Sequence, residues 1–125
     1  MQDTEHNYTN SISLWEKAQD VLVGGVNSPV RAFKAVGGTP VFIQKAQAAY
    51  LWDVDDQRYI DYMCGWGAII LGHAPSSLTQ TLDTVAKNGL CFGAPTVLGT
   101  QLATSIRQHM PHLRKIRFAN SGTEA

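Results

Sequence analysis

The chain has 125 residues, of which 44% are hydrophobic and 9% aromatic, and this composition is typical of one globular domain with a buried core. Ten basic residues balance ten acidic ones, so we do not expect electrostatic binding to nucleic acid or to an anionic membrane. The sequence shows no signal-peptide pattern, no membrane-length apolar run and no cysteine motif, so we expect a cytoplasmic protein in which Cys64 and Cys91 are free thiols.

The first predicted element is a helix near the N-terminus. Residues 1–10 are polar and are expected to form a disordered tail. Ser13 and Glu16 fit a capping box, in which each side chain satisfies an unpaired amide at the start of a helix. Apolar residues then recur at helical spacing, and Gly24–Gly25 is predicted to end the helix.

A small antiparallel unit is predicted next. Pro29 makes the preceding stretch irregular, because proline cannot continue a regular helix. Short runs rich in β-branched and aromatic residues then predict strands over 41–43, 49–54 and 58–63, with a polar hairpin connection at Asp55–Gln57. The stretch 64–75 is broken by glycines and matches neither a strand nor a helix.

Two helices, a strand and the start of a third helix follow. One helix is predicted from Ser76 or Ser77 to Asn88–Gly89, and another from Thr96 to a stop before Pro111. Residues 115–119 read as a strand. This order predicts an α/β fold that divides into a tail (1–10), an N-terminal segment with a small antiparallel sheet (11–75) and the beginning of a larger domain (76–125).

The sequence Ser121-Gly122-Thr123 comes directly after the last predicted strand and opens a helix. The first amides of a helix have no intrahelical partner and carry partial positive charge, so they can hold a phosphate. The glycine allows close approach, and the two hydroxyls add donors. The same three residues also suit an ordinary helix cap, and taken alone they favour the cap.

Several segments, in this order and spacing, resemble the N-terminal part of the glutamate-1-semialdehyde 2,1-aminomutases. These are class-III, fold-type-I enzymes that depend on pyridoxal phosphate. "GGVNSPVRAF" (Gly24–Phe33) is specific to the aminomutases, whereas "NSGTEA" (Asn120–Ala125) and the strand containing Tyr50 and Trp52 are shared with class-III aminotransferases in general. The other matching segments are "VGGTPVFI" (36–43), "WGAIILGH" (66–73) and "FGAPT" (92–96).

The resemblance implies a site, a cofactor and a reaction. It implies that Ser121, Gly122 and Thr123 bind the phosphate of pyridoxal 5′-phosphate or pyridoxamine 5′-phosphate. It implies that Arg31, with Ser28 nearby, holds a substrate carboxylate, and that Trp66 lines the active site. The implied reaction converts glutamate-1-semialdehyde to 5-aminolevulinate in tetrapyrrole (porphyrin) biosynthesis, and the implied assembly is a homodimer.

Two features depart from the family. Gly65 and Ala68 stand where the family usually has serine and proline around the Trp-Gly pair. The stretch "GLCFGAPTVLG" lacks the hydroxyl residues usual before Phe92 and the acidic residue usual after Thr96. Members of the family are several times longer, and their Schiff-base lysine lies beyond position 125. We therefore expect an N-terminal piece that is inactive alone, because no lysine matches that position among Lys17, Lys34, Lys45, Lys87 and Lys115.

Other candidate sites are weaker. His73 at a loop junction is more often structural than catalytic. His109 and His112 are separated by Pro111, which breaks the helix that would align them on a metal. The acidic cluster Asp53–Asp56 lacks the glycine and distal glutamate of a calcium loop, so we predict no metal site.

Simpler explanations stay open for the substrate residues as well. Arg31 also suits a surface position with its stem packed beside Phe33, and Trp66 also suits a core aromatic. Two alternative functions also stay open. One is a class-III ω-aminotransferase, and the other is a non-catalytic module that binds an anion or a partner chain.

Overall fold

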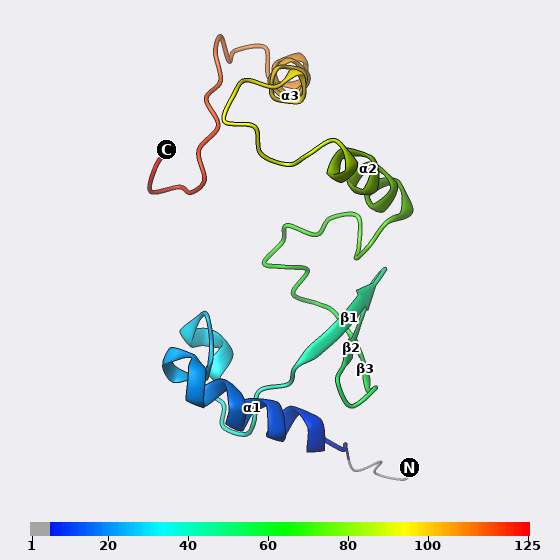
Figure 1. Cartoon of the computed structure of the whole chain (residues 1–125), viewed down its shortest axis with the longest axis vertical. Coiled ribbons are helices and arrows are strands. Elements are labelled where there is room, and N and C mark those ends of the chain that lie inside the picture. The colour runs from blue at the N-terminus through cyan, green and yellow to red at the C-terminus, as the bar shows by residue number, and fades with distance from the viewer. Residues whose placement is uncertain (1–5) are drawn as a thin grey trace. The chain divides into compact units, whose positions relative to one another are not determined.

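The computed structural model describes residues 6–125, which form two compact units. The first unit ends at Thr84 and the second covers Val85–Ala125, and each is described here by itself. The division falls inside a helix and does not coincide with the boundary predicted between Pro75 and Ser76. The elements, labelled in Figure 1 apart from the two short 3₁₀ helices η1 and η2, are α1 (Thr9–Val21), η1 (Val23–Gly25), η2 (Pro29–Ala32), β1 (Ile43–Gln47), β2 (Tyr50–Asp53), β3 (Arg58–Ile60), α2 (Ser76–Lys87) and α3 (Val97–His109).

The three strands form one antiparallel sheet in the order β1-β2-β3. Leu51 lies opposite Tyr59, and the pairing of β1 with β2 has an irregularity between Ile43 and Lys45. The hairpin connection predicted between the second and third strands is confirmed. The first strand was predicted at 41–43 but runs over Ile43–Gln47, because the polar residues that follow Ile43 pair with β2 although they lack an apolar pattern.

A fully buried aspartate organises the β2–β3 hairpin. One oxygen of Asp53, Oδ1, accepts from the backbone N–H groups of Asp55 (2.9 Å) and Gln57 (2.8 Å). The other, Oδ2, accepts from the hydroxyl of Tyr59 at 2.7 Å. Burial and this contact with Asp53 raise the pKa of Tyr59 well above its ordinary value. Asp53 therefore fixes the tight turn by hydrogen bonding.

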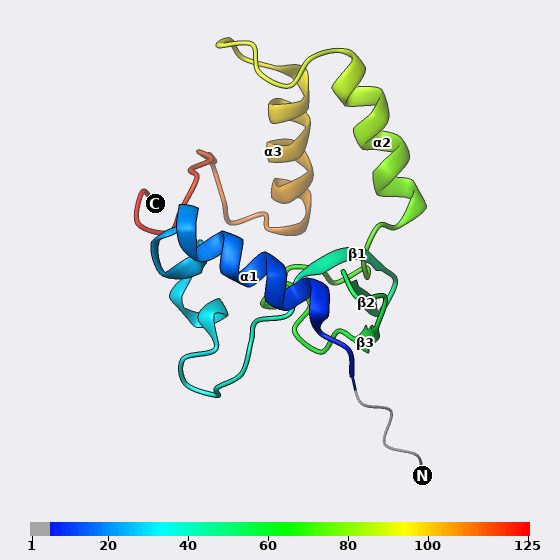
Figure 2. The same cartoon turned by 60° about the horizontal axis from the view of Figure 1, so that its bottom comes forward.

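The N-terminus of α1 is capped by the same hairpin. The carboxylate of Asp55 accepts from the N–H groups of Asn10 (2.8 Å) and Ser11 (3.0 Å), which are unpaired donors of the first helical turn. Figure 2 shows α1 beside the three-stranded sheet, within the first unit. Burial raises the pKa of Asp55, but these hydrogen bonds outweigh burial and leave the pKa below its ordinary value.

The predicted start of the first helix was wrong. The helix begins at Thr9 rather than Ser13, so residues 9 and 10 are helical and do not belong to a tail. The reason is that Asp55, far along the chain, supplies the cap that the sequence analysis assigned to Ser13. The predicted tail residues 1–5 lie outside the described residues. The helix ends at Val21, and the glycine pair that follows has left-handed backbone angles, with φ of 67° and 73°.

The second unit contains α3 and has no buried residue. The predicted cap is confirmed, since Thr96 Oγ1 accepts from Gly99 N at 3.2 Å, and the helix ends before Pro111 as predicted. The apolar residues Leu98 and Leu102 are 56% and 53% exposed.

The predicted strand over 115–119 is wrong, because no strand pairs with it within residues 6–125 and an isolated segment cannot complete a ladder. No helix among the described residues is both long enough and apolar enough to span a membrane.

Candidate cofactor and substrate site

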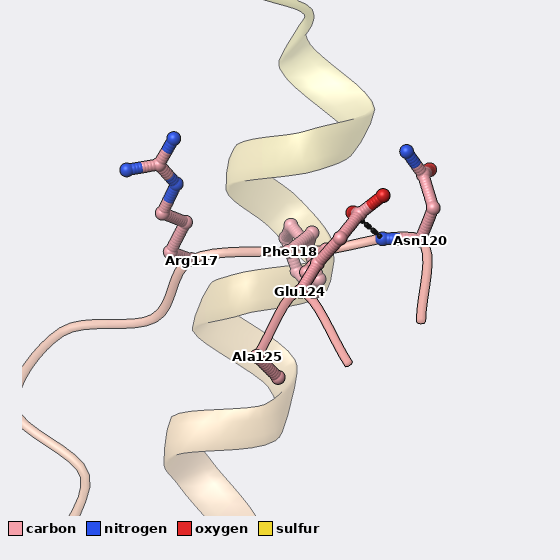
Figure 3. A pocket seen from close by; sticks show the side chains of 6 residues that line it. Arg117, Phe118, Asn120, Glu124 and Ala125 are labelled. Atoms are coloured by element: carbon pink, nitrogen blue, oxygen red, sulfur yellow. Dashed lines mark hydrogen bonds between the residues drawn. The ribbon is translucent and has the colours of Figure 1, made fainter. Parts of the chain in front are cut away.

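The Ser121–Ala125 segment forms a single turn that begins like a helix. Ala125 N donates to the carbonyl of Ser121 at 3.2 Å, and Glu124 N donates to Ser121 Oγ at 3.3 Å. The carboxylate of Glu124 reaches back to accept from Asn120 N at 2.9 Å (Figure 3). This arrangement is close to a capping box, with the returning carboxylate shifted by one residue.

The turn leaves donors available for an anion. Within residues 6–125, the backbone N–H groups of Gly122 and Thr123 have no hydrogen-bond partner. Gly122 is also open on its side-chain face, since a Cβ atom placed there would meet nothing within 4 Å. Ser121 Oγ accepts from Glu124 N, and its own hydroxyl proton can still be donated. These donors fit a phosphate dianion.

A surface hollow of about 630 Å³ adjoins this turn. Arg117, Phe118 and Asn120 line it with the carboxylate of Glu124, and Figure 3 shows the guanidinium of Arg117 set apart from that carboxylate. A carboxylate already held by a backbone N–H shows that this turn accommodates negative charge. The same carboxylate would repel a second anion unless it turned away, and the sequence analysis did not foresee this competition.

The predicted substrate residues Arg31 and Ser28 lie in one short turn. The helix η2 starts after Ser28, and Arg31 N donates to the carbonyl of Ser28 at 3.0 Å. Arg31 is exposed and borders a hollow of about 400 Å³ that Asn27 and apolar residues such as Phe42 also line. No carboxylate among the described residues is within ion-pair distance of Arg31, so its guanidinium can bind an external carboxylate.

Trp66 stands on a strained loop. Four consecutive residues have positive φ: Cys64 (46°), Gly65 (58°), Trp66 (62°) and Gly67 (87°). The turn is held by hydrogen bonds from Gly67 N and Ile69 N to the carbonyl of Cys64, at 3.1 and 2.9 Å. The side chain of Trp66 is 72% exposed, so it is available to wall a pocket and is not a core aromatic within the described residues.

The sequence analysis missed one polar pair in this region. Asp61 Oδ2 lies 2.6 Å from His73 Nε2, and both side chains are largely buried, at 6% and 15% exposure. His73 was predicted to be structural, and nothing in the sequence marked Asp61 as its partner. The only local signal was the loop junction at which His73 stands.

The predicted site residues fall in two groups. Ser28, Arg31 and Trp66 belong to the first unit, and Ser121, Gly122 and Thr123 belong to the second. Ser28 and Arg31 share a turn, and Ser121 to Thr123 share another. Within residues 6–125, no hydrogen bond or ring contact joins Trp66 to either substrate residue.

The sequence matches the family profile described as Aminotransferase class-III over residues 33–125. A glutamate-1-semialdehyde 2,1-aminomutase of Legionella pneumophila (strain Paris) is 54% identical over 117 residues, which are 94% of this chain and 27% of that protein. The chain thus spans about a quarter of the length of this curated relative.

Solved structures give the same fold. An ω-transaminase from Sphaerobacter thermophilus superposes with a TM-score of 0.81 at 30% identity, over 92% of this chain and 26% of that one. A structure described as a transaminase with PLP bound superposes with a TM-score of 0.84 at 27% identity, over 95% and 27%. The α/β fold assigned to the sequence, the N-terminal part of a fold-type-I transferase, is therefore confirmed.

Proposed function

Because the chain belongs to the class-III aminotransferase family, we propose that it contributes to an enzyme that converts glutamate-1-semialdehyde to 5-aminolevulinate with pyridoxal or pyridoxamine 5′-phosphate as cofactor. The observation that carries the proposal is the 54% identity to an aminomutase over 117 residues, which are 94% of this chain. The unpartnered amides at Gly122 and Thr123 support the cofactor part of it.

The phosphate end of the cofactor would be held by the second unit. The N–H groups of Gly122 and Thr123 would donate to phosphate oxygens, aided by the positive end of the helical turn. The hydroxyls of Ser121 and Thr123 would donate as well, while Ser121 keeps its backbone contact with Glu124. The bound cofactor would supply an electron sink for moving the amine, and the protein would supply its orientation.

The substrate would be held by the first unit. Arg31 offers a planar guanidinium that can take the carboxylate of a glutamate-derived substrate through two parallel hydrogen bonds. Ser28 can add a hydroxyl contact from the same turn. Trp66 would form an apolar wall that excludes water from the reacting end. These three roles are proposals: Arg31 and Trp66 are exposed, and Ser28 is partly exposed.

A class-III ω-aminotransferase is the nearest alternative, and the solved ω-transaminase at 30% identity is the observation that favours it. An intramolecular exchange needs no second substrate, whereas an aminotransferase needs an amino acceptor. The complete gene product should therefore form 5-aminolevulinate from glutamate-1-semialdehyde with no keto acid added. A strict requirement for a keto acid would overturn the aminomutase proposal.

The remaining proposals concern the chain itself. Residues 1–125 should be inactive alone, since no lysine matches the family's cofactor-anchoring position. A single lysine adduct formed with pyridoxal phosphate in stoichiometric amount and trapped by borohydride would overturn this.

The alternative of a stand-alone binding module predicts that residues 1–125 melt cooperatively as a monodisperse species. We expect aggregation through the exposed apolar residues instead. We also propose that the complete enzyme is a cytoplasmic homodimer.

A further inference from the structure

The loop that carries Trp66 is closed at its base by backbone hydrogen bonds. Ala48 and His73 exchange two of them, Ala48 N to His73 O at 2.9 Å and His73 N to Ala48 O at 2.8 Å. Asp61 N donates to the carbonyl of the next residue, Ala49, at 2.9 Å. Both ends of the 61–73 loop are therefore tied to two adjacent residues, as in a compact Ω-type loop.

The side chains of Asp61 and His73 add a second closure at the same place. Asp61 Oδ2 meets His73 Nε2 at 2.6 Å. Its other oxygen, Oδ1, accepts from Met63 N (2.9 Å) and Cys64 N (3.0 Å), which open the left-handed turn. One carboxylate thus joins the base of the loop to the strained turn above it.

The turn needs such support because its backbone is costly. Cys64 and Trp66 are not glycines, and the left-handed region is unfavourable for a residue that carries a Cβ atom. Conformations of this kind persist where the surrounding structure determines them, and they are common at functional sites. Gly72 tightens the base further, since a Cβ atom there would lie 2.9 Å from the carbonyl oxygen of Ala48.

We propose that Asp61 and His73 are positioning residues, whose hydrogen bond closes the 61–73 loop and holds the left-handed Cys64–Gly67 turn so that Trp66 is presented to the substrate. This inference rests on the proposed role of Trp66 as a pocket wall. Neither Asp61 nor His73 touches the substrate in this scheme. Their contribution is to keep Trp66 in one orientation. Without the pair, the strained turn would relax and Trp66 would lose that orientation.

The electrostatics of the pair agree with this role. The hydrogen bond with His73, and then that with the N–H of Cys64, hold the pKa of Asp61 below its ordinary value. The titratable groups that line the hollow of about 370 Å³ beside the pair are Asp61, Cys64 and His73 themselves. Because the pKa of Asp61 is lower in the folded state, its carboxylate contributes to the stability of the fold above the usual carboxyl pKa of about 4. This contribution is lost as the pH falls through the folded-state pKa.

The test uses the complete gene product labelled with 5-fluorotryptophan, with the Trp66 resonance assigned through Trp66→Phe. His73→Ala should shift or broaden that resonance and raise KM for glutamate-1-semialdehyde by about ten-fold with a smaller change in kcat. His73→Gln places an amide donor near the position of Nε2 and should return both readouts close to the wild-type values. His109→Ala, which removes an exposed histidine bonded to the Ser105 carbonyl, is the matched control and should change neither.

The possible results separate the two proposals. An unchanged Trp66 resonance in His73→Ala, or a failure of His73→Gln to restore it, would overturn the positioning role. Asp61→Asn provides a second variant that keeps the acceptor for Met63 and Cys64, and it should shift the resonance in the same direction as His73→Ala. If Trp66→Phe itself leaves KM and kcat unchanged, the proposed pocket role of Trp66 fails, whatever the resonance does.

Discussion

The β2–β3 hairpin with α1 and the Val85–Ala125 unit show two different ways of holding a chain. In the hairpin, Asp53 is completely buried and each of its oxygens is hydrogen-bonded, and Asp55 caps a helix that lies more than forty residues earlier in the chain. In the Val85–Ala125 unit no residue is buried, and α3 relies on its Thr96 cap and its own backbone. The comparison teaches that a polar network can determine the local structure where little apolar surface is buried.

The difference bears on the proposed site. Ser28 and Arg31 belong to the unit with the polar network, and Ser121 to Thr123 belong to the unit without buried residues. A helix of the length of α3 is marginal by itself in water. Within the described residues, the groups proposed to bind the substrate therefore rest on a better-determined scaffold than those proposed to bind the phosphate.

The largest expected effect comes from Asp53→Ala in the hairpin. The change removes the acceptor of Asp55 N, Gln57 N and the Tyr59 hydroxyl, and groups of this kind are costly to leave unpaired. We expect a loss of about 2–4 kcal/mol in the free energy of unfolding. Urea unfolding of the 125-residue chain, at a concentration low enough to prevent aggregation and followed by tryptophan fluorescence, reports on this unit, since Trp15, Trp52 and Trp66 all lie in it.

Asp56→Asn is the matched control for that change. Asp56 stands in the same turn but is exposed, and its side chain accepts only from Gln44 Nε2 within the described residues. Asp56→Asn should change the denaturant midpoint of unfolding only slightly. Equal effects of the two variants would contradict the role assigned to the buried carboxylate.

A pair of glycines gives the next largest effect. Gly24 and Gly25 both have positive φ, so alanine is strained at either position. A Cβ atom at Gly25 would also lie 2.5 Å from the Trp15 ring, whereas one at Gly24 would meet nothing within 4 Å. Gly25→Ala should therefore cost about 1–3 kcal/mol more than Gly24→Ala. Thermal unfolding of the two variants measures the difference, and equal Tm values would show that Trp15 does not pack there.

Tyr59→Phe should weaken the same network by about 1 kcal/mol, the value of one hydrogen bond. The pKa of Tyr59 is raised in the folded state, so its contribution is fully present below the ordinary value of about 10 and is lost as the pH rises through the folded-state value. Unfolding measured from pH 8 upward should therefore show a steeper loss of stability in the wild type than in Tyr59→Phe. Parallel pH profiles would argue against the contact.

The smallest expected effect is in the Val85–Ala125 unit. Leu102 is already 53% exposed, so Leu102→Ala should change the stability of α3 by about 0.5 kcal/mol or less in the 125-residue chain, studied at a concentration low enough to prevent aggregation. Amide hydrogen exchange of α3 is the appropriate measurement. A loss of several kcal/mol would mean that another surface covers this helix and that the contrast with the hairpin is wrong.

An element of the fold could be predicted from the sequence where the contacts that determine it lie between neighbouring residues, and not where they come from distant ones. The limits of α3 were predictable because Thr96 and Pro111 act on the adjacent backbone. The start of α1 was not, because its cap is Asp55. The strand predicted over 115–119 failed because a strand needs a partner, and no residue pattern supplies one.

In the candidate site, too, local features could be predicted and contacts between distant residues could not. The turn at Ser121-Gly122-Thr123 was predictable, since consecutive residues form it, and its role in binding a phosphate stays a prediction. The contact of Asp61 with His73 was not, because Ala48 and Ala49 bring the two ends of that loop together and neither alanine carries a functional signal.

The most direct test of the proposed phosphate grip is amide hydrogen exchange of the complete gene product with pyridoxamine 5′-phosphate, compared with pyridoxamine lacking the phosphate. The account predicts that exchange at Gly122 and Thr123 slows with the phosphorylated compound alone. Equal slowing with both compounds, or no change at these two amides while the cofactor is bound, would contradict it.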